Sequence, residues 1–419
     1  MNTPRFYGWT VVAAAFVVAV FGWGVGFYGP PVFLKAVRDA RGWSVALVSA
    51  AITVHFLVGA LAVANLPKLY RRFGLAPVTV AGAVSLAFGV AGWAFAVEPW
   101  QLFAATLFSG AGWVALGAAG INAMVSPWFN RGRPAALSTA YNGASIGGMI
   151  FSPLWVALIG WGGFPVASVS VGIVMIAVIV ILSVRVFGRT PESMGLVPDG
   201  DAIPAAVFVA QVRVERLWRD RAFLTLALAM SLGLFAQIGL IAHLFSLLVP
   251  AMGAQGAGLA AGLAAASAIM GRTLVGWLLP AGADRRVVGA MNHGVQIAGC
   301  CAFLAAAGTN IPLLLLGVLL FGAGIGNTTS MPPLIAQTEF AKADVVRVVA
   351  LVVAVAQASF AFAPAVFGMI RDATALDGSA TVPVLFVTAI GFQVAAGVAY
   401  WVGRDSFRVR VAVHGGGSV

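Results

Sequence analysis

One arginine in the middle of a long apolar stretch is the clearest chemical feature of this sequence. Arg272 lies within residues 257–280, where most neighbours are Ala, Gly, Leu and Met. A charged side chain at the centre of a membrane costs about 3 kcal/mol or more, so such residues normally face a cavity and have a function. A guanidinium group binds a carboxylate through two parallel hydrogen bonds. Arg272 therefore indicates a binding site for a small organic anion.

The positions of the acidic residues bear on whether this arginine has a structural partner. All 13 Asp and Glu residues fall in predicted loops or at the ends of predicted spans. An arginine with a structural role would pair with a carboxylate, or with helix-end carbonyl groups, at its own depth. Because the predicted spans offer no carboxylate, we expect a substrate anion to be the partner of Arg272, with a structural role as the alternative.

The number of buried charges favours one class of anion. Arg272 is the single basic residue predicted in the middle of a span, and one positive charge neutralises one carboxylate. A dianion such as oxalate would stay half unneutralised in apolar surroundings. We therefore expect a monocarboxylate substrate, with a dicarboxylate as the alternative.

Two histidines lie inside predicted spans, His55 within 46–67 and His243 within 222–252. Imidazole is the side chain whose ordinary pKa lies near neutrality, so both are candidates for coupling a proton to anion transport. The alternative for each is a neutral histidine that joins two helices by hydrogen bonds.

These candidate residues belong to a chain that is too apolar for a water-soluble protein. Hydrophobic residues make up 61% of the 419 residues, charged residues make up 9%, and the mean hydropathy is +0.99. A soluble domain carries roughly 25% charged residues. The composition excludes a soluble enzyme, a disordered protein and a secreted disulfide scaffold. The two cysteines, Cys300 and Cys301, are adjacent in an apolar run and indicate small apolar residues of a helix.

The apolar stretches predict an all-α integral membrane protein with twelve transmembrane helices, because a span takes about 20 residues. The stretches lie near 8–33, 46–67, 76–97, 101–129, 135–160, 165–187, 222–252, 257–280, 287–307, 311–337, 348–370 and 380–403. We predict an N-terminal six-helix bundle at 1–187, a cytoplasmic linker at 188–221, a C-terminal six-helix bundle at 222–403 and a cytoplasmic tail at 404–419. Gly29-Pro30-Pro31 should break or bend the first span near its outer end.

The basic residues of the loops predict the orientation of the chain in the membrane. The loops on the side of the two termini carry 19 of the 24 Lys and Arg residues, and the opposite loops carry only Lys35, Arg38, Arg41 and Arg371. Positive loop residues mark the cytoplasmic side. Both termini are therefore expected in the cytoplasm, and the net charge of +11 reflects topology and attraction to anionic lipid rather than nucleic-acid binding.

Short motifs recur in the two halves at nearly constant offsets. Gly110-Ala111-Gly112 matches Gly322-Ala323-Gly324 at an offset of 212, and Phe151-Ser152-Pro153 matches Phe362-Ala363-Pro364 at 211. The stretch from Pro67 to Arg72 matches the stretch from Pro280 to Arg285 at 213. Matches in order and in equivalent spans indicate two pseudo-symmetric six-helix bundles, an arrangement typical of transporters whose substrate binds between the repeats.

The whole chain resembles the major facilitator superfamily of transporters. The loop Leu69-Tyr70-Arg71-Arg72-Phe73-Gly74 is similar to the superfamily's motif between spans 2 and 3, although Arg71 replaces the usual Asp and Pro67 the usual first Gly. The copy after span 8 keeps Asp284-Arg285-Arg286. The resemblance implies the major facilitator fold, with Arg71, Arg72, Asp284 and Arg285 as gating-loop residues.

A closer resemblance is to the monocarboxylate transporters and the bacterial oxalate/formate exchangers. It rests on Trp128 to Leu137, Asn142 to Gly147, Tyr7-Gly8-Trp9 and Arg272, which lies where the family has a substrate-binding arginine. In the family, spans 1, 7 and 11 border the cavity, which adds Tyr28, Gln237 and Gln357 as substrate-binding residues, together with Asn142. The chain departs from the family at three positions: Ala268 and Tyr28 replace an Asp and a Lys of the animal transporters, and Gln357 replaces a Lys of the exchangers.

The sequence thus predicts a secondary active transporter of small organic anions, most simply monocarboxylates of the lactate or pyruvate type. It would work by alternating access as a proton symporter or an anion exchanger, and the alternative is a dicarboxylate or oxalate–formate antiporter. The sequence has no nucleotide-binding loop and no metal-ligand cluster, so we expect neither an enzyme nor a cofactor or metal. We expect a monomer in the plasma (inner) membrane that contacts lipid, its anion and protons, and no nucleic acid.

Overall fold

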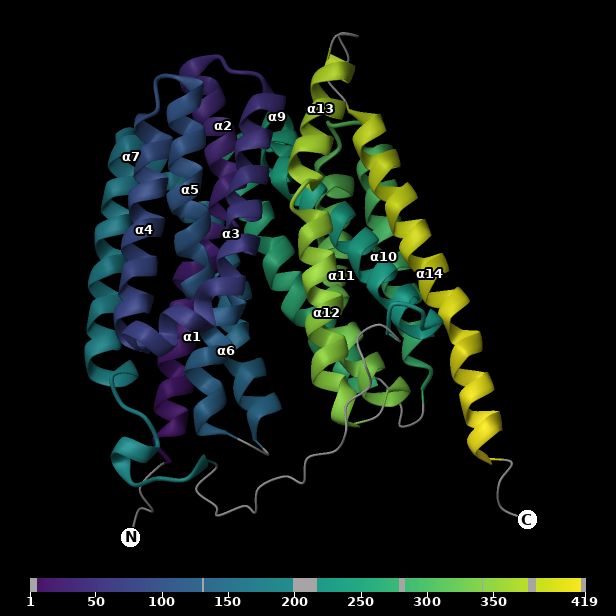
Figure 1. Cartoon of the computed structure of the whole chain (residues 1–419). Coiled ribbons are helices and arrows are strands. Elements are labelled where there is room, and N and C mark those ends of the chain that lie inside the picture. The colour runs from purple at the N-terminus through teal and green to yellow at the C-terminus, as the bar shows by residue number, and fades with distance from the viewer. Residues whose placement is uncertain are drawn as a thin grey trace. The chain divides into compact units, whose positions relative to one another are not determined.

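The computed structural model contains helices and no strand in the part of the chain that it describes, residues 6–129, 132–198, 217–278, 283–340, 342–375 and 382–415 (Figure 1). Within these ranges, ten helical stretches are long and apolar enough to cross a membrane. Helices satisfy every backbone hydrogen bond within the segment, which a membrane interior requires. The predicted all-α membrane fold is confirmed.

Two of these stretches are long enough to cross the membrane twice. Helix α7 (Arg133–Leu182) has 50 residues and α9 (Arg221–Leu278) has 58. At about 1.5 Å per residue, 50 residues cover about 75 Å, more than twice the roughly 30 Å of the hydrocarbon layer. Each helix is interrupted by one glycine with a positive φ, Gly163 (φ 77°) and Gly253 (φ 70°), a conformation that glycine adopts without strain. When α7 is divided at Gly163 and α9 at Gly253, the ten stretches become twelve spans.

The N-terminal half begins with a broken first span. Helix α1 ends at Gly26, and α2 starts at Gly29 with proline in its first turn, so the predicted break near Gly29-Pro30-Pro31 is confirmed. The structure adds a second break, at Gly117, which the sequence analysis did not predict. The helices before α7 are α1 (Gly8–Gly26), α2 (Gly29–Arg41), α3 (Val45–Phe73), α4 (Leu75–Phe95), α5 (Pro99–Leu116), α6 (Ala118–Val125) and the short η1 (Ser126–Trp128).

The C-terminal half differs from the prediction at its last two spans. The span expected at 348–370 is two helices, because a turn at Ala361 and Phe362 precedes Pro364, which cannot donate a backbone hydrogen bond. The last helix continues to Gly415, beyond the expected end at 403. After α7 the elements are η2 (Ser183–Phe187), η3 (Glu192–Met194), α9, α10 (Arg285–Ala306), α11 (Ile311–Glu339), α12 (Lys342–Phe360), α13 (Ala363–Ala375) and α14 (Pro383–Gly415).

The described chain forms two compact units, one with α1 to α7 and Gly253–Gly262 and one with the rest of α9 and α10 to α14. The predicted linker at 188–221 and the last residues of the predicted tail lie partly outside the described residues. In the first unit α1 packs on α7 and α4 on α5, and in the second α10 packs on α11 and α14 (Figure 1).

Small residues bring the helix backbones of each unit into contact. A Cβ atom on Gly143 of α7 would lie 2.2 Å from the carbonyl oxygen of Phe16, and one on Gly322 of α11 would lie 2.6 Å from that of Ala264. Glycine at these positions allows the close helix approach that is common in membrane bundles. In the second unit this contact sets the distance between the two elements, α9 and α11, that position Arg272.

Candidate functional site

Arg272 lies on the second limb of α9, inside the membrane-crossing stretch Arg221–Val275, and is half-buried. Its Nε donates a hydrogen bond to the carbonyl oxygen of Gly326 on α11, at 3.4 Å. A Cβ atom on Gly326 would lie 2.5 Å from the carbonyl oxygen of Ala268 and 3.2 Å from this Nε, so a larger residue here would clash with the α9 backbone beside the guanidinium. The fold therefore places a positive charge within the span against a backbone oxygen of the neighbouring helix.

Gln237, expected to bind substrate, is fully buried among other polar side chains of the second unit. Its Nε2 donates to Oε1 of Gln296 on α10 at 2.8 Å and to Oγ1 of Thr328 on α11 at 2.6 Å. These contacts join three helices and favour a structural role for Gln237. Gln357 is half-buried on α12.

The buried amide network around Gln237 was not predicted from the sequence. His293 and Gln296 of α10 both bind Gln393 of α14, and the bond from Gln393 Nε2 to Gln296 Oε1 is 2.9 Å long. Asn292 donates to the carbonyl oxygen of Gly324 at 3.1 Å. The signal was present in the sequence, because positions 292, 293 and 296 share one face of a helix in an otherwise apolar stretch.

Two other expected substrate residues belong to the first unit. Tyr28 is the residue before α2, at the break after α1, and its ring packs edge-on against Phe27 with centroids 5.1 Å apart. Asn142 is half-buried on α7. The break that the Gly29-Pro30-Pro31 sequence causes is therefore what positions Tyr28 among the aromatic rings of this unit.

Two of the stretches that carry the closer sequence resemblance, Tyr7 to Trp9 and the one that begins at Trp128, pack against one another at the start of α1. The Tyr7 ring lies 5.2 Å from that of Trp128, and the Trp9 ring lies 5.3 Å from that of Phe129. Trp128 and Phe129 are buried. This aromatic cluster fixes the N-terminus of α1 against the α6–α7 connection, whose residues Asn130 and Arg131 lie outside the described residues.

The two candidate proton-coupling histidines have different surroundings. Both ring nitrogens of His55 are used, since Nε2 lies 3.0 Å from the carbonyl oxygen of Gly26 and Nδ1 lies 2.8 Å from Oγ of Ser109. Nε2 of His243 lies 3.3 Å from the carbonyl oxygen of Pro364, and its Nδ1 is buried with no hydrogen-bond partner among the described residues. The contacts favour a structural role for His55 and leave His243 with an atom that can take up a proton.

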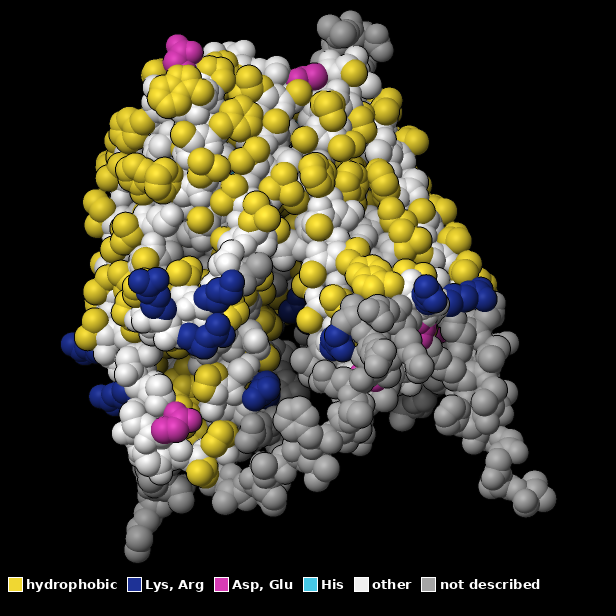
Figure 2. Space-filling view, in the orientation of Figure 1, with side chains coloured by type: hydrophobic (Ala, Val, Ile, Leu, Met, Phe, Trp, Pro, Cys, Tyr) yellow, Lys and Arg dark blue, Asp and Glu magenta, His cyan; other side chains and the backbone are white. Residues whose placement is uncertain are grey.

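The residues expected in the gating loops of the two halves differ in their contacts. Arg71 and Arg72 end α3 and are exposed, with the Arg72 guanidinium 5.1 Å from the centroid of the Phe73 ring. Figure 2 shows Lys and Arg side chains gathered at this end of α3 and α4, below the apolar surface. In the second unit, Asp284 caps α10 and pairs with Arg404 at 2.7 Å, while Arg285 donates to the carbonyl oxygen of Leu334.

Arg286, the third residue of that loop motif, makes an almost completely buried ion pair. Its Nε and Nη2 donate to the two carboxylate oxygens of Glu339 at 2.7 and 2.8 Å, and the two side chains are 1% and 6% exposed. Nη1 donates to Thr225 and Nη2 also to the carbonyl oxygen of Ala222. Glu339 lies at the end of α11, as the apolar pattern predicts for all acids near spans, but the pattern does not predict that a span-end acid is buried and paired.

The surroundings of Asp284 lower its pKa. Burial alone would raise the pKa, but hydrogen bonds from Arg404 and from the backbone N–H groups of Val287 and Arg286 outweigh it. A carboxylate whose pKa is lowered by folding stabilises the protein above its ordinary pKa, and this stabilisation is lost as the pH falls through the folded-state value.

Two substitutions at Asp284 separate its charge from its capping role. Asn retains the cap, so we expect Asp284→Asn to cost about 0.2–1 kcal/mol at pH 7, the range of an exposed ion pair. Asp284→Ala also removes the cap, which adds about 1 kcal/mol. Thermal unfolding of the purified protein from pH 7 to pH 3 checks this. The difference in unfolding midpoint between the wild type and Asp284→Asn should disappear below about pH 4. A difference that does not change with pH would contradict the account.

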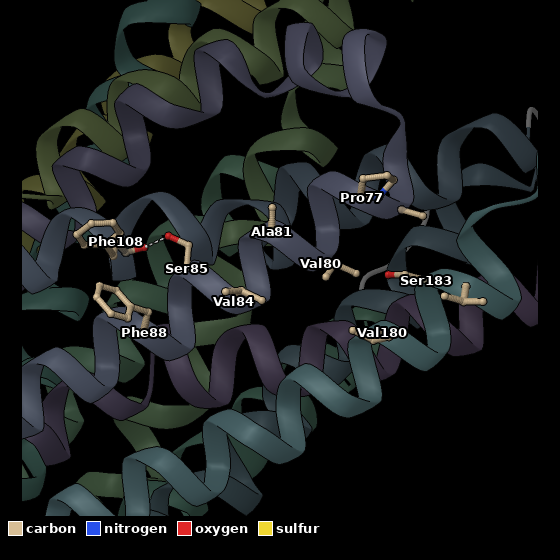
Figure 3. Close-up of a pocket in the computed structure, with 11 residues that line it drawn as sticks. Pro77, Val80, Ala81, Val84, Ser85, Phe88, Phe108, Val180 and Ser183 are labelled. Carbon is tan, nitrogen blue, oxygen red and sulfur yellow. Dashed lines mark hydrogen bonds between the residues drawn. The ribbon is translucent and has the colours of Figure 1, made fainter.

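A large groove of the first unit lies away from these polar residues. It has a volume of about 830 Å³ and lies on α4, α5 and the end of α7 with η2 (Figure 3). Its lining holds apolar residues and two serines, and the Ser85 hydroxyl already donates to the carbonyl oxygen of Phe108 at 2.8 Å. The groove offers no charged group to a carboxylate, so it is not a candidate site for an organic anion.

Comparisons with known proteins agree with this description. The family model described as Major Facilitator Superfamily matches residues 11–364. A search of curated protein sequences gives no match.

Solved structures with the same fold cover nearly all of the chain. A bacterial homologue of the human lysosomal transporter Spinster, inward-facing and unoccupied, has a TM-score of 0.70 at 14% identity over 97% of this chain and 99% of that one. Its occupied form has a TM-score of 0.66 at 16% identity over 98% of both chains. A mutant of the nucleoside transporter NupG has a TM-score of 0.68 at 13% identity over 94% and 99%. At these identities the likeness shows the fold alone, and the family match shows that this chain belongs to the Major Facilitator Superfamily.

Proposed function

We propose that this transporter carries small monocarboxylates, of the size of lactate or pyruvate, by alternating access, and that Arg272 binds the carboxylate. The observation that carries the proposal is the position of Arg272 inside a membrane span, on a limb of α9 packed against the glycine-rich face of α11. A charge kept at this depth is normally functional. The planar guanidinium can donate two parallel hydrogen bonds to one carboxylate.

Charge balance supports a monoanion over a dianion. Arg272 and one carboxylate together are neutral, so the loaded site can move through a closed, apolar state without an uncompensated charge. A dicarboxylate would leave one negative charge at the site. An empty carrier would still have to reorient the charged arginine, which favours either anion exchange or symport with a proton. His243 is the favoured proton-coupling residue of the two histidines, because its Nδ1 has no hydrogen-bond partner among the described residues.

We further propose the orientation that the loop charges indicate. The loops expected on the side of the termini hold 19 basic residues and the opposite loops hold four. This asymmetry supports cytoplasmic termini in the plasma (inner) membrane. A monomer contains both repeats and therefore both halves of a transport path, so no second copy is required.

Uptake by proteoliposomes tests the substrate class. The purified chain is reconstituted, and the uptake of labelled lactate, pyruvate, formate and oxalate is measured with and without an inward proton gradient. We expect saturable uptake of a monocarboxylate that unlabelled monocarboxylates inhibit and oxalate does not. Preference for oxalate, with formate as the exchanged anion, would replace this proposal with the dicarboxylate antiporter, and uptake of none of the four would overturn the anion assignment.

A further inference from the structure

A second arginine of the C-terminal unit reaches another span, which the loop assignment of the sequence did not predict. Arg371 lies on the last turns of α13 and is half-buried. Its Nη1 donates to Oγ of Ser246 on α9 at 2.5 Å. Ser246 donates in turn to the carbonyl oxygen of His243, one helical turn earlier, at 2.8 Å. The guanidinium therefore points toward the stretch of α9 that contains His243.

Two contacts hold α9 and α13 together along this stretch. Nε2 of His243 lies 3.3 Å from the carbonyl oxygen of Pro364, and Arg371 binds Ser246. Ser246 follows His243 on α9, and Arg371 follows Pro364 on α13. The two helices therefore run parallel along this stretch. A carbonyl oxygen only accepts, so Nε2 carries the proton and Nδ1 carries a lone pair. Nδ1 is buried and has no hydrogen-bond partner among the described residues.

The charged surroundings of His243 come mainly from Arg371. Among the described residues, Arg371 is the one whose charge acts on the imidazole of His243. Asp372 is the next residue on α13. From α10 and α14, the residues beside this part of α9 are apolar, namely Phe303, Leu304 and Phe386, which pack near Leu244, Leu247 and Leu248. A proton on Nδ1 would therefore add a second positive charge close to the first.

A carboxylate bound at Arg371 changes this balance. Its negative charge offsets the guanidinium, and its second oxygen can accept a hydrogen bond from a protonated Nδ1. Each of the two ligands then strengthens the binding of the other by the same factor, because coupling between two sites is reciprocal. The proton comes from water and returns to water, so no bond other than this N–H forms or breaks.

We infer that Arg371, Ser246 and His243 form an anion subsite in the C-terminal unit, in which a carboxylate and a proton bind together. The inference rests on the proposed carboxylate substrate, and it makes proton symport rather than exchange the mode of coupling. Arg371 binds the carboxylate, Ser246 holds the guanidinium toward α9, and His243 carries the proton. This subsite uses residues other than Arg272, so one carboxylate binds the two arginines one after the other and neutralises one guanidinium at a time.

Two readouts on proteoliposomes of the full chain test the subsite. Counterflow of labelled lactate at equal pH on both sides measures anion exchange, and a trapped pH-sensitive dye measures proton entry when lactate is added outside. His243→Asn is expected to lose lactate-dependent proton entry, and its counterflow should require a higher lactate concentration, because no bound proton strengthens the binding of the carboxylate. Arg371→Gln is expected to raise the KM for lactate at least about tenfold, the effect of one lost charged hydrogen bond. Arg371→Lys should fall between Gln and wild type.

Controls keep the outcomes distinct. Arg41→Gln removes an outer-loop arginine that likewise donates to another element, the carbonyl oxygen of Ala96 at 2.8 Å, and should behave as wild type. Should His243→Asn fail to give monodisperse protein, His243→Gln replaces it. Unchanged proton entry in the His243 variants, or an unchanged KM in Arg371→Gln, overturns the subsite and leaves the transporter assignment intact. Wild type that shows no lactate counterflow overturns the proposed substrate and the subsite together.

Discussion

Replacing Arg272 with alanine is expected to reduce carboxylate uptake at least about 100-fold. Hydrogen bonds to charged groups contribute about 1.5–3 kcal/mol each, so the loss of a bidentate pair costs about 3 kcal/mol or more. Each 1.4 kcal/mol is a factor of about ten in affinity. Initial uptake rates in proteoliposomes, measured over a range of lactate concentrations, check the size of the effect.

Two further variants show whether the effect belongs to the guanidinium. Arg272→Lys retains the charge but not the planar pair of donors, so it should restore only part of the uptake. Arg221→Ala removes the exposed arginine that begins the same helix and donates to the carbonyl oxygen of Val402, and uptake should be retained. Full uptake in Arg272→Ala would make this arginine structural.

Breaking the buried ion pair between Arg286 and Glu339 is expected to cost more stability than any other single substitution considered for this chain. Both carboxylate oxygens are bound, and both side chains are almost completely buried. Removing one partner leaves a buried charge without its counter-ion, which costs about 3–5 kcal/mol. Glu339→Leu should therefore lower the midpoint of thermal unfolding sharply, as measured on detergent-purified protein by size-exclusion chromatography after heating.

The double variant Arg286→Met/Glu339→Leu identifies the cause. It removes both charges and fills the space with apolar groups, and such replacements are often neutral or stabilising. We expect it to recover most of the stability lost by Glu339→Leu alone. Asp284→Asn is the matched control, because its pair with Arg404 is much more exposed. A double variant as unstable as the single one would show that the pair itself, rather than the stranded charge, contributes the stability.

The helices could be predicted because the membrane restricts what an apolar chain can form. Apolar stretches of span length gave twelve helices, and Gly29-Pro30-Pro31 indicated the first break. The turns at Gly163 and Gly253 fall between predicted spans, where a positive φ requires glycine. The breaks at Gly117 and before Pro364 were not predicted, since a glycine or proline inside a span is compatible with a continuous helix when neighbours replace the lost hydrogen bond.

Only those site residues could be predicted whose type alone indicates a function. Arg272 was identified because a charge in an apolar span is rare. The pairing of Arg286 with Glu339, and of Arg371 with Ser246, joins residues 53 and 125 positions apart, which one sequence does not reveal. Both arginines were counted as loop residues, because span ends were placed by hydropathy. Gln237 was expected at the substrate, but polar groups that share a buried face bind one another first.

Counterflow is the measurement that tests the central claim, that this chain is a carrier of monocarboxylates. Proteoliposomes are loaded with unlabelled lactate, diluted into a trace of labelled lactate, and sampled over time. A carrier that exchanges one anion for another accumulates the label transiently above its equilibrium level, and Arg272→Ala should abolish this overshoot. Label that only rises to equilibrium in the wild type would indicate a channel, and no entry of label would contradict the monocarboxylate assignment.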